Sequence, residues 1–520
     1  MNKLLKLLCG LTAAVVLFAG VPSMADDGGA DGKDGKSVRG KSLEERIREL
    51  EEKLKDVGYT GVKGSGVKLS GYVDTSYVVN LRGQDGSTPI AGATGTADPA
   101  GNPTQTQFGN ARVFDYQHDE FVLNAVKLTL EKDKDDSDFP AGFRVDLMYG
   151  VDAMVLGNRR NIAVAEGGDT PDDSENDSTF YLEQAYINLG LPVGNGIDVK
   201  IGKMVTLIGY EVIESPANAN FSRSFAFNLA PFTQTGVTFG YNFNEYITAT
   251  IGLINGPDND GVDHFIIGGF TSGNRAPLSG AGNANTEFCG VYRVDVRSPD
   301  WSCGTFNLGV SGLFGNDSRV DSTLTDGAGN FATTPWDNST SINIVDVCGT
   351  WARPFGHEPL SLGFEFFTQS QERRMPNVFL GTGVEENSQD DWTTALYARY
   401  QVTDWMYLAG RAEYWDADGR TAAANGIYNR AILPNAPFFG LVVPGWDDNQ
   451  ISVYSGTLTA GFNVWKDTLV RLEWRHDEVA GNQNGFLNAQ SLIFGGTLDT
   501  LMPQIRSGQD TIAVNVAYSF

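Results

Sequence analysis

Charged side chains alternate with apolar ones in several segments of this sequence. In Phe143-Arg144-Val145-Asp146-Leu147 the charges take every second position, and Val470-Arg471-Leu472-Glu473-Trp474-Arg475 and Val199-Lys200-Ile201 repeat the pattern. Successive side chains of a strand point to opposite faces, so these segments would carry their charges on one face and apolar residues on the other. Such a face would be out of place in a packed soluble core, and it suits a wall between water and lipid.

The chemistry open to this charged face is electrostatic. By the same parity, the predicted lumen-facing charges are Arg144, Asp146, Lys200, Arg293, Arg399, Arg411, Glu413, Arg471, Glu473 and Arg475. Opposite charges on facing sides of a lumen would create a transverse field that favours polar solutes over apolar ones. The alternative is that many of these charges pair with one another and stiffen the wall.

Catalytic signatures are missing from the sequence. The four histidines, His118, His264, His357 and His476, are scattered, and there is no His-Glu-x-x-His pair, no Gly-x-Ser-x-Gly elbow and no phosphate-binding loop. The segment Asp258-Asn259-Asp260-Gly261-Val262-Asp263 has the oxygen spacing of a calcium loop but lacks the closing Glu, so we expect a solvated acidic loop. We therefore predict no catalytic residues, no cofactor and no metal site.

The composition indicates which elements position the charges. The chain has 520 residues with 62 Gly, 11% aromatic and only 20% charged residues, which favours β-structure with many turns. Its formal net charge of −26 excludes a nucleic-acid partner, because phosphate binding needs a basic surface. Lys3, Lys6, the apolar run up to Val21 and the small residues Ser23 and Ala25 predict a signal peptide over residues 1–25, and therefore export.

From residue 66 onward the sequence shows the two-residue period of strands. Sixteen segments have the length that a tilted strand needs to cross a bilayer: 67–80, 119–131, 141–151, 179–190, 197–207, 232–243, 245–255, 287–297, 303–314, 342–353, 359–371, 392–402, 404–416, 451–463, 467–477 and 510–520. Short turns and long loops rich in Gly, Asp and Asn alternate between them, as in an outer-membrane barrel. We predict an all-β fold over residues 66–520, a transmembrane antiparallel β-barrel of about 16 strands. The stretches 256–286 and 417–450 could each contain one more hairpin.

Residues 26–65 are predicted to be a polar linker followed by a short periplasmic helix. The helix covers 42–57, where Ser42 and Glu45 form a capping box. Its apolar positions follow a coiled-coil seam of about two heptads: Leu43, Ile47, Leu50, Leu54 and Val57. Either the helix forms a small coiled coil that oligomerises the barrel or reaches toward the cell wall, or it docks singly on the periplasmic end of the barrel.

One long loop, residues 208–231, is rich in aromatic and aliphatic residues, whereas the other long loops are mostly Asp, Gly, Asn and Ser. A loop of this composition should not stand in water. We predict that it folds into the barrel as the third external loop and narrows the pore, with Glu211, Glu214 and Arg223 at the constriction. The alternative is that it packs over a neighbouring molecule at a subunit contact.

The C-terminal strand and the cysteines give two further predictions. Apolar and aromatic residues take every second position up to the last residue, with Tyr518 and Phe520 as a predicted assembly signal. Cys9 leaves with the signal peptide, and three cysteines remain. Cys303 and Cys348 could form a disulfide across the hairpin of the ninth and tenth strands, since exported proteins permit disulfides. The alternative is that the three cysteines are small residues at tight positions.

A series of short motifs resembles the OmpL-like β-barrel porins of Gram-negative-type bacteria. The motifs are Gly71-Tyr72-Val73-Asp74-Thr75-Ser76-Tyr77, Val113-Phe114-Asp115 with His118, Gly142-Phe143-Arg144-Val145-Asp146-Leu147, Gln184-Ala185-Tyr186-Ile187, Gly202-Lys203, Leu207-Ile208-Gly209-Tyr210-Glu211-Val212-Ile213-Glu214-Ser215-Pro216, Asn220-Phe221-Ser222-Arg223-Ser224 and Pro231-Phe232-Thr233-Gln234-Thr235-Gly236. The likeness is strong over about residues 66–260 and at the C-terminus, and weak between them. It implies an outer-membrane diffusion channel without catalytic residues.

Together these observations predict a porin of the bacterial outer membrane that lets small polar solutes and ions diffuse through a water-filled channel. A different reading is a structural barrel that tethers the membrane to the cell wall through the helix 42–57. The expected partners are outer-membrane lipid, the barrel assembly machinery, and small polar solutes and ions. The assembly that we keep open is a homo-trimer.

Overall fold

The computed structural model of this chain describes sixteen stretches. They are residues 66–81, 90–91, 105–106, 114–115, 120–135, 137–157, 180–255, 266–267, 270–271, 288–319, 338–376, 384–418, 427–429, 450–480, 484–486 and 507–520. All of them belong to one compact unit, Val62–Phe520. The predicted signal peptide 1–25, the linker and helix within 26–65, and the acidic segment 258–263 lie outside the described residues.

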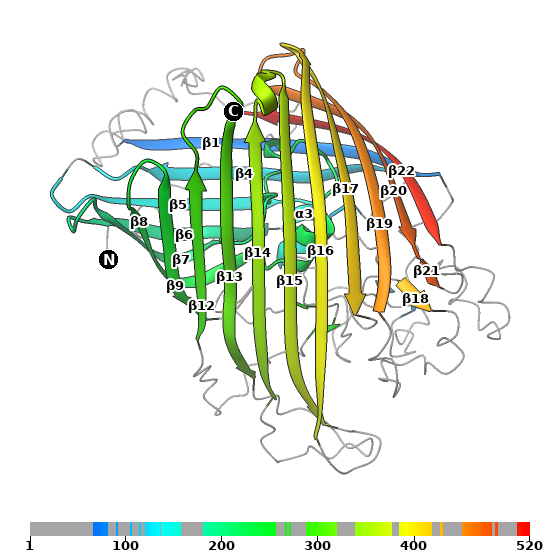
Figure 1. Cartoon of the computed structure of the whole chain (residues 1–520), viewed down its shortest axis with the longest axis horizontal. Coiled ribbons are helices and arrows are strands. Elements are labelled where there is room, and N and C mark those ends of the chain that lie inside the picture. The colour runs from blue at the N-terminus through cyan, green and yellow to red at the C-terminus, as the bar shows by residue number, and fades with distance from the viewer. Residues whose placement is uncertain are drawn as a thin grey trace, which may run out of the picture. The chain divides into compact units, whose positions relative to one another are not determined.

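Sixteen antiparallel strands form one closed barrel (Figure 1). The strands are β1 (Val67–Asn80), β4 (Phe121–Lys132), β5 (Ala141–Tyr149), β6 (Phe180–Leu191), β7 (Ile197–Val205), β8 (Thr233–Asn242), β9 (Ile247–Ile254), β12 (Cys289–Arg297), β13 (Thr305–Arg319), β14 (Asn338–Ala352), β15 (Leu360–Pro376), β16 (Val384–Thr403), β17 (Met406–Asp418), β19 (Gln450–Phe462), β20 (Thr468–Val479) and β22 (Gly508–Ser519). Each pairs with its neighbours in chain order, and β1 pairs with β22 to close the barrel. Every predicted segment corresponds to one of these strands, so the all-β barrel is confirmed.

Short strand pairs lie in the connections and do not join the barrel. They are β2 (Ile90–Ala91) with β3 (Gln105–Thr106), β10 (Ile266–Ile267) with β11 (Phe270–Thr271), and β18 (Ile427–Asn429) with β21 (Asn484–Phe486). The stretch 256–286 therefore contains a hairpin, β10–β11, as one of our alternatives allowed, but it adds no strand to the barrel. In 417–450, β18 pairs with a strand from a different connection.

The described helical segments are all short. They are α3 (Val151–Gly157), α4 (Phe225–Leu229) and the 3₁₀ turns η1 (Ser215–Ala217) and η2 (Pro354–Gly356). Within the described residues, no helix combines the length and the hydropathy needed to span a membrane.

Side-chain burial alternates along the barrel strands. In β22 the side chains of Ile512, Val514, Val516 and Tyr518 are 36–48% exposed, whereas Ala513, Asn515 and Ala517 between them are buried. The outward row is apolar or aromatic and the inward row is small or polar. This is the pattern of a strand with lipid on one side and a polar interior on the other.

The last residue takes part in closing the barrel. The amide of Phe520 donates to the carbonyl oxygen of Gly71 at 2.9 Å, and the Gly71 amide donates back to Phe520 at 3.0 Å. A Cβ atom at Gly71 would lie 2.1 Å from the carbonyl oxygen of Lys127, so only glycine fits beside the neighbouring strand. The C-terminus is therefore fixed by the backbone of the first strand.

The predicted disulfide between Cys303 and Cys348 is wrong. Cys289, Cys303 and Cys348 are all free thiols. In the β13–β14 register, Cys348 lies opposite Gly309, six residues along the chain from Cys303. At about 3.3 Å per residue this offset is roughly 20 Å, far beyond the Cα separation of under about 7 Å that a disulfide allows.

Candidate functional site

The chain between β7 and β8, residues 206–232, lies inside the barrel. Its aromatic side chains are buried: Phe221 is 7% exposed, Phe225 1% and Phe227 5%. The segment contains η1 and α4, and Ser224 caps α4 by accepting a hydrogen bond from the Phe227 amide at 3.0 Å. We call residues 208–231 the inner loop. Most of its apolar residues are removed from water by the barrel itself, as their composition requires, whereas Val212 is exposed.

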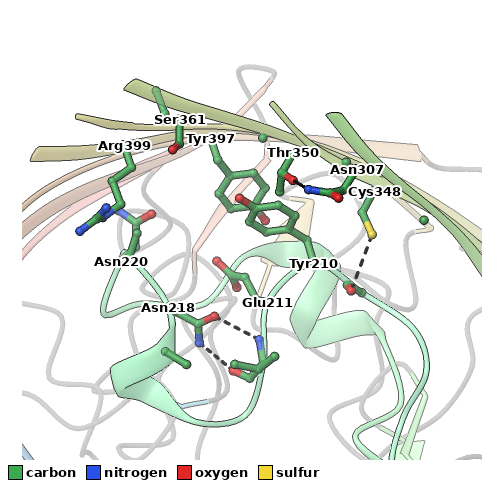
Figure 2. Close-up of a pocket in the computed structure, with 18 of the residues that line it drawn as sticks. Tyr210, Glu211, Asn218, Asn220, Asn307, Cys348, Thr350, Ser361, Tyr397 and Arg399 are labelled. Carbon is green, nitrogen blue, oxygen red and sulfur yellow. Dashed lines mark hydrogen bonds between the residues drawn. The ribbon is translucent and has the colours of Figure 1, made fainter. Parts of the chain in front are cut away.

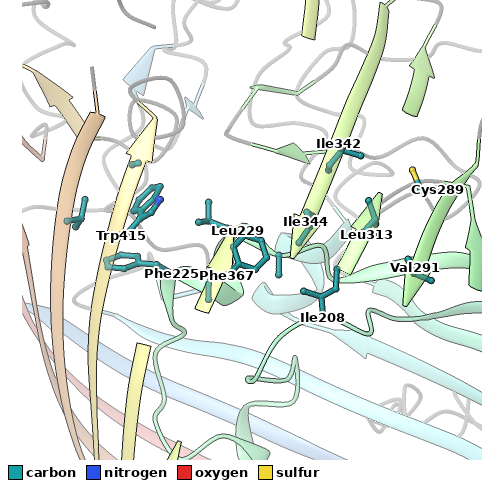
Figure 3. Close-up of a cluster of buried hydrophobic side chains, with 14 of the residues drawn as sticks. Ile208, Phe225, Leu229, Cys289, Val291, Leu313, Ile342, Ile344, Phe367 and Trp415 are labelled. Carbon is teal, nitrogen blue, oxygen red and sulfur yellow. The ribbon is translucent and has the colours of Figure 1, made fainter. Parts of the chain in front are cut away.

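The apolar side of the inner loop packs against the interior of the opposite strands. Phe225 of α4 lies beside Trp415 of β17, with ring centroids 5.4 Å apart (Figure 3). Leu229 and Ile208 belong to the same buried cluster, which also contains inward residues of β13, β14 and β15: Leu313, Ile344 and Phe367. The inner loop thus begins at β7 and reaches strands far along the barrel.

Charged residues of the far wall bind the backbone of the inner loop. The Glu473 carboxylate of β20 accepts from the amides of Phe221 and Ser222, at 2.6 and 2.9 Å. Two residues further on, Arg475 donates to the carbonyl oxygen of Arg223 at 2.6 Å. Both wall side chains are buried. Hydrogen bonds that involve a charged partner are stronger than neutral ones, so these contacts fix the position of the loop.

Two further arginines complete this attachment. Arg471 of β20 donates to three loop carbonyl oxygens at 2.9–3.0 Å, those of Ser215, Asn218 and Asn220. Arg411 of β17 forms an ion pair with Glu211 at 2.8 Å and donates to the carbonyl oxygen of Ser222 at 2.6 Å. Both guanidinium groups are buried. A buried cation must be satisfied by acceptors, and here the loop supplies them.

Two of the three predicted constriction residues are used within this attachment. Glu211 accepts from the Ser224 amide at 2.7 Å with the oxygen that does not contact Arg411. Arg223 donates to the carbonyl oxygens of Ile213 and Phe221, at 2.6 and 3.1 Å. Glu211 and Arg223 are buried and shape the loop from within.

The third predicted residue, Glu214, joins a charged cluster on the near wall. The ammonium group of Lys127 lies 2.5 Å from Glu214, 2.9 Å from Glu183 and 3.0 Å from Asp146. Three carboxylates this close together have the donor set of a divalent metal site. Here the Lys127 ammonium contacts all three of them and supplies the positive charge. Glu214 is the most accessible of the three, with its side chain 27% exposed.

The inner face predicted from the sequence omits Lys127 and Glu183, because the alternation of inward and outward side chains is interrupted at a β-bulge. The β1–β4 register shifts between Asp74 and Thr75, so that neighbouring residues Asn124 and Ala125 of β4 are both buried. A bulge adds one residue to a strand and reverses which side chains face inward beyond it. A second shift, in β5–β6, buries Glu183 and Gln184 together in the same way. Only the paired strands reveal these positions.

Most of the remaining predicted lumen charges have partners on the wall. Arg144 and Arg293 each pair with the aspartate two residues ahead in the same strand, at 3.0 and 2.9 Å. Glu413 pairs with Arg411 at 2.6 Å. Lys200 lies over the ring of Tyr186 in β6, 5.0 Å from its centroid. Arg399 makes no ion pair among the described residues. The wall is therefore largely charge-paired, in line with the stiffening alternative.

A cavity of about 460 Å³ lies between the inner loop and the wall formed by β12 to β17 (Figure 2). Tyr210 of the loop stacks on Tyr397 of β16, with centroids 4.2 Å apart and planes inclined by 22°. Burial raises the pKa of Tyr210 to about 12, so its phenol is neutral at physiological pH. Further lining residues are Asn218, Asn220, Arg293, Asp295, Cys348, Ser361 and Arg399.

Comparison with known proteins gives one family match. Residues 66–520 match the model of the family described as "Putative beta-barrel porin-2, OmpL-like". Among curated proteins there is no match.

Several solved structures share the fold of this chain at low sequence identity. OmpT of Vibrio cholerae is 10% identical, with 87% of this chain and 97% of that chain covered and a TM-score of 0.44. The channel DcaP of Acinetobacter baumannii is 10% identical over the same shares, with a TM-score of 0.45. An anion-selective porin from Comamonas acidovorans is 13% identical over 87% and 99%, with a TM-score of 0.44.

The family match covers the whole barrel, from the first strand to the terminal Phe520. It includes the inner loop and the wall charges that hold it. The chain belongs to the OmpL-like β-barrel porin family, and it forms a channel for passive diffusion across the bacterial outer membrane.

Proposed function

We propose that the inner loop is the constriction of this channel, and that its width sets which small polar solutes and ions pass. The observation that carries this proposal is the attachment of the loop across the lumen. It leaves β7, and its backbone is bound by Glu473, Arg471 and Arg475 of β20 and by Arg411 of β17. A segment held on both sides of a barrel must divide its cross-section.

The roles of the predicted constriction residues differ. Glu211 and Arg223 set the shape of the loop from its buried side, and Glu214 contributes the charge nearest to the water path. The attachment also favours a fixed constriction over a moving gate. Each hydrogen bond to a charged partner contributes about 1.5–3 kcal/mol, and releasing the loop would break several at once.

The experiment that tests the constriction removes it. Deletion of residues 211–224 should raise the single-channel conductance of purified protein in a planar bilayer several-fold, because the narrowest part of the path is lost. Folding of the variant is checked by its heat-dependent mobility in gel electrophoresis. An unchanged single-channel conductance from the folded deletion variant would contradict the proposal.

The deletion also removes the acceptors of buried arginines, so a milder variant is needed in case it does not fold. Glu473→Gln keeps the chain length and weakens the attachment to Phe221 and Ser222, together with the hydrogen bond from Thr459 of β19. It should give a larger or noisier open-channel current. Agreement between the two variants would assign the conductance change to the loop.

We further propose that residues 1–25 are removed on export and that the barrel assembles as a homo-trimer with lipid around it. The N-terminal sequence of mature protein and its native mass in detergent test the two statements separately. A mature chain that starts at residue 26 and a mass of three chains are the expected results. We expect no hydrolytic activity, since the proposed transport is passive.

A further inference from the structure

The cavity between the inner loop and the wall carries four charged side chains, and three of them are neutralised. Asp295 accepts from Arg293 with both carboxylate oxygens at 2.9 Å, and Arg293 also donates to the Leu207 carbonyl oxygen at 2.8 Å. Glu211 is paired with Arg411. These pairs hold the loop and the wall together, and they offer little to a solute.

The fourth charge, Arg399, is not neutralised. Its guanidinium donates to the side-chain oxygen of Gln401 at 2.7 Å and lies 4.4 Å from the ring centroid of Tyr407. Within the part of the chain that the structure describes, no carboxylate lies within the 4.0 Å of an ion pair. The cavity therefore has one uncompensated positive charge, held in place by an aromatic face and one amide.

The surroundings of Arg399 suit a ligand with one polar end. Ser361 of β15 lies directly opposite Arg399 in the strand register, and Asn220 of the inner loop also lines the cavity (Figure 2). Away from Arg399 the charged lining residues are paired, and the lining includes the Tyr210–Tyr397 stack, Val212, Ala217 and several glycines. Its volume falls within the range of about 300–1,000 Å³ of small-molecule sites, which are mostly apolar with a few placed polar groups.

We propose that Arg399 anchors a binding site in this cavity for small organic monoanions, namely a carboxylate on a short, flat apolar body. The carboxylate would accept from the guanidinium and the Ser361 hydroxyl, and the body would lie along the aromatic and small-residue wall. The proposal deepens the channel function by naming a class of solute, and it rests on that function for access to the cavity.

Benzoate is a suitable probe, with benzamide as its neutral counterpart of the same shape. In equilibrium dialysis, purified protein in a zwitterionic detergent should bind benzoate at least about tenfold more tightly than benzamide, as expected for loss of a charged hydrogen-bond partner. Arg399→Gln should lose the same factor for benzoate. Equal binding of the two probes to wild-type protein would overturn the proposal, even if the variant did not fold.

The matched control is Lys466→Gln, which removes one positive charge from a side chain that is 91% exposed in the turn between β19 and β20. It should bind benzoate as wild type does. A loss as large as that of Arg399→Gln would assign the effect to overall charge and refute the site. Chloride that competes with benzoate at equal concentration would refute the preference for organic anions.

Bilayer recordings separate this proposal from the channel function. In KCl, wild-type protein should show unitary currents that benzoate interrupts and benzamide leaves unchanged. Currents that benzoate does not interrupt would refute the proposed binding site without contradicting the channel function. No current from folded wild-type protein would contradict the channel itself, while dialysis would still decide whether Arg399 binds benzoate.

Discussion

Glu473 illustrates how a single wall residue controls the inner loop. It accepts two loop amides and the hydroxyl of Thr459 at 2.7 Å, and it is buried. Glu473→Gln should weaken this attachment by about 1–3 kcal/mol, because Gln keeps one uncharged acceptor oxygen and replaces the other with an NH2 group that cannot accept from a loop amide. The expected result is larger or noisier open-channel current in single-channel recordings.

The control for this variant is Glu358→Gln, an exposed carboxylate that pairs with Arg353 near a short turn. It removes the same charge without touching the inner loop. Identical currents from Glu473→Gln, Glu358→Gln and wild-type protein would show that the loop attachment does not govern conduction.

The cysteines give a second prediction at the residue scale. Cys289 and Cys348 are buried and Cys303 is half-buried, and none is bonded to another. Protein denatured without reductant should therefore react with three equivalents of a thiol reagent per mature chain. A count of one would mean that two of these cysteines are linked in the cell, and would contradict the three free thiols of the structure.

At the scale of elements, the C-terminal strand contributes to the stability of the barrel through its backbone and to assembly in the membrane through its side chains. The Phe520 backbone closes the barrel on Gly71, whereas its side chain is 50% exposed. Phe520→Asp should therefore lower the amount of barrel found in the outer membrane strongly, since the terminal aromatic signal is lost. The same variant refolded in detergent should keep its melting temperature within a few degrees.

Phe520→Tyr is the matched control, because it keeps an aromatic ring at the last position. Its outer-membrane yield should equal that of the natural sequence. Normal insertion of Phe520→Asp into the outer membrane would contradict the assembly role that we predict for Tyr518 and Phe520.

The lengths of β15 and β16 show where the two-residue period stops predicting the ends of strands. β15 ends at Pro376, well past the predicted residue 371, and β16 begins at Val384, well before the predicted residue 392. The added residues are mostly polar, so the alternation that marks a lipid-facing strand fades. Their strand conformation comes from backbone pairing between the two neighbours, which depends on the partner.

At the scale of the whole molecule, net charge predicts ion preference. The chain carries −26, and the long external loops are acidic, so the channel mouth should enrich cations within a Debye length of about 8 Å at physiological salt. In a KCl gradient, the reversal potential recorded in a planar bilayer should have the sign expected of a channel with a mild preference for K⁺ over Cl⁻. Raising the salt concentration should reduce the preference, and a reversal potential of the opposite sign would refute it.

The sequence by itself determined the barrel and its two faces. A period of two residues, strands of membrane-crossing length and alternating loop lengths are local properties, and each of the sixteen strands followed from them. The composition of residues 208–231 likewise indicated a loop that avoids water. Arg293, Arg411, Arg471 and Glu473 were expected on the inner face, and each forms a hydrogen bond to the chain between β7 and β8.

Only the tertiary structure decided what those charges contact. Arg471 meets loop residues more than 250 positions away, and no spacing in the sequence encodes such a partner. The bulge that turns Lys127 inward and the register that separates Cys303 from Cys348 depend on pairing between strands. Periodicity fixes the face on which a side chain lies, whereas closure of the barrel fixes its neighbours, because pairing and loop placement are long-range.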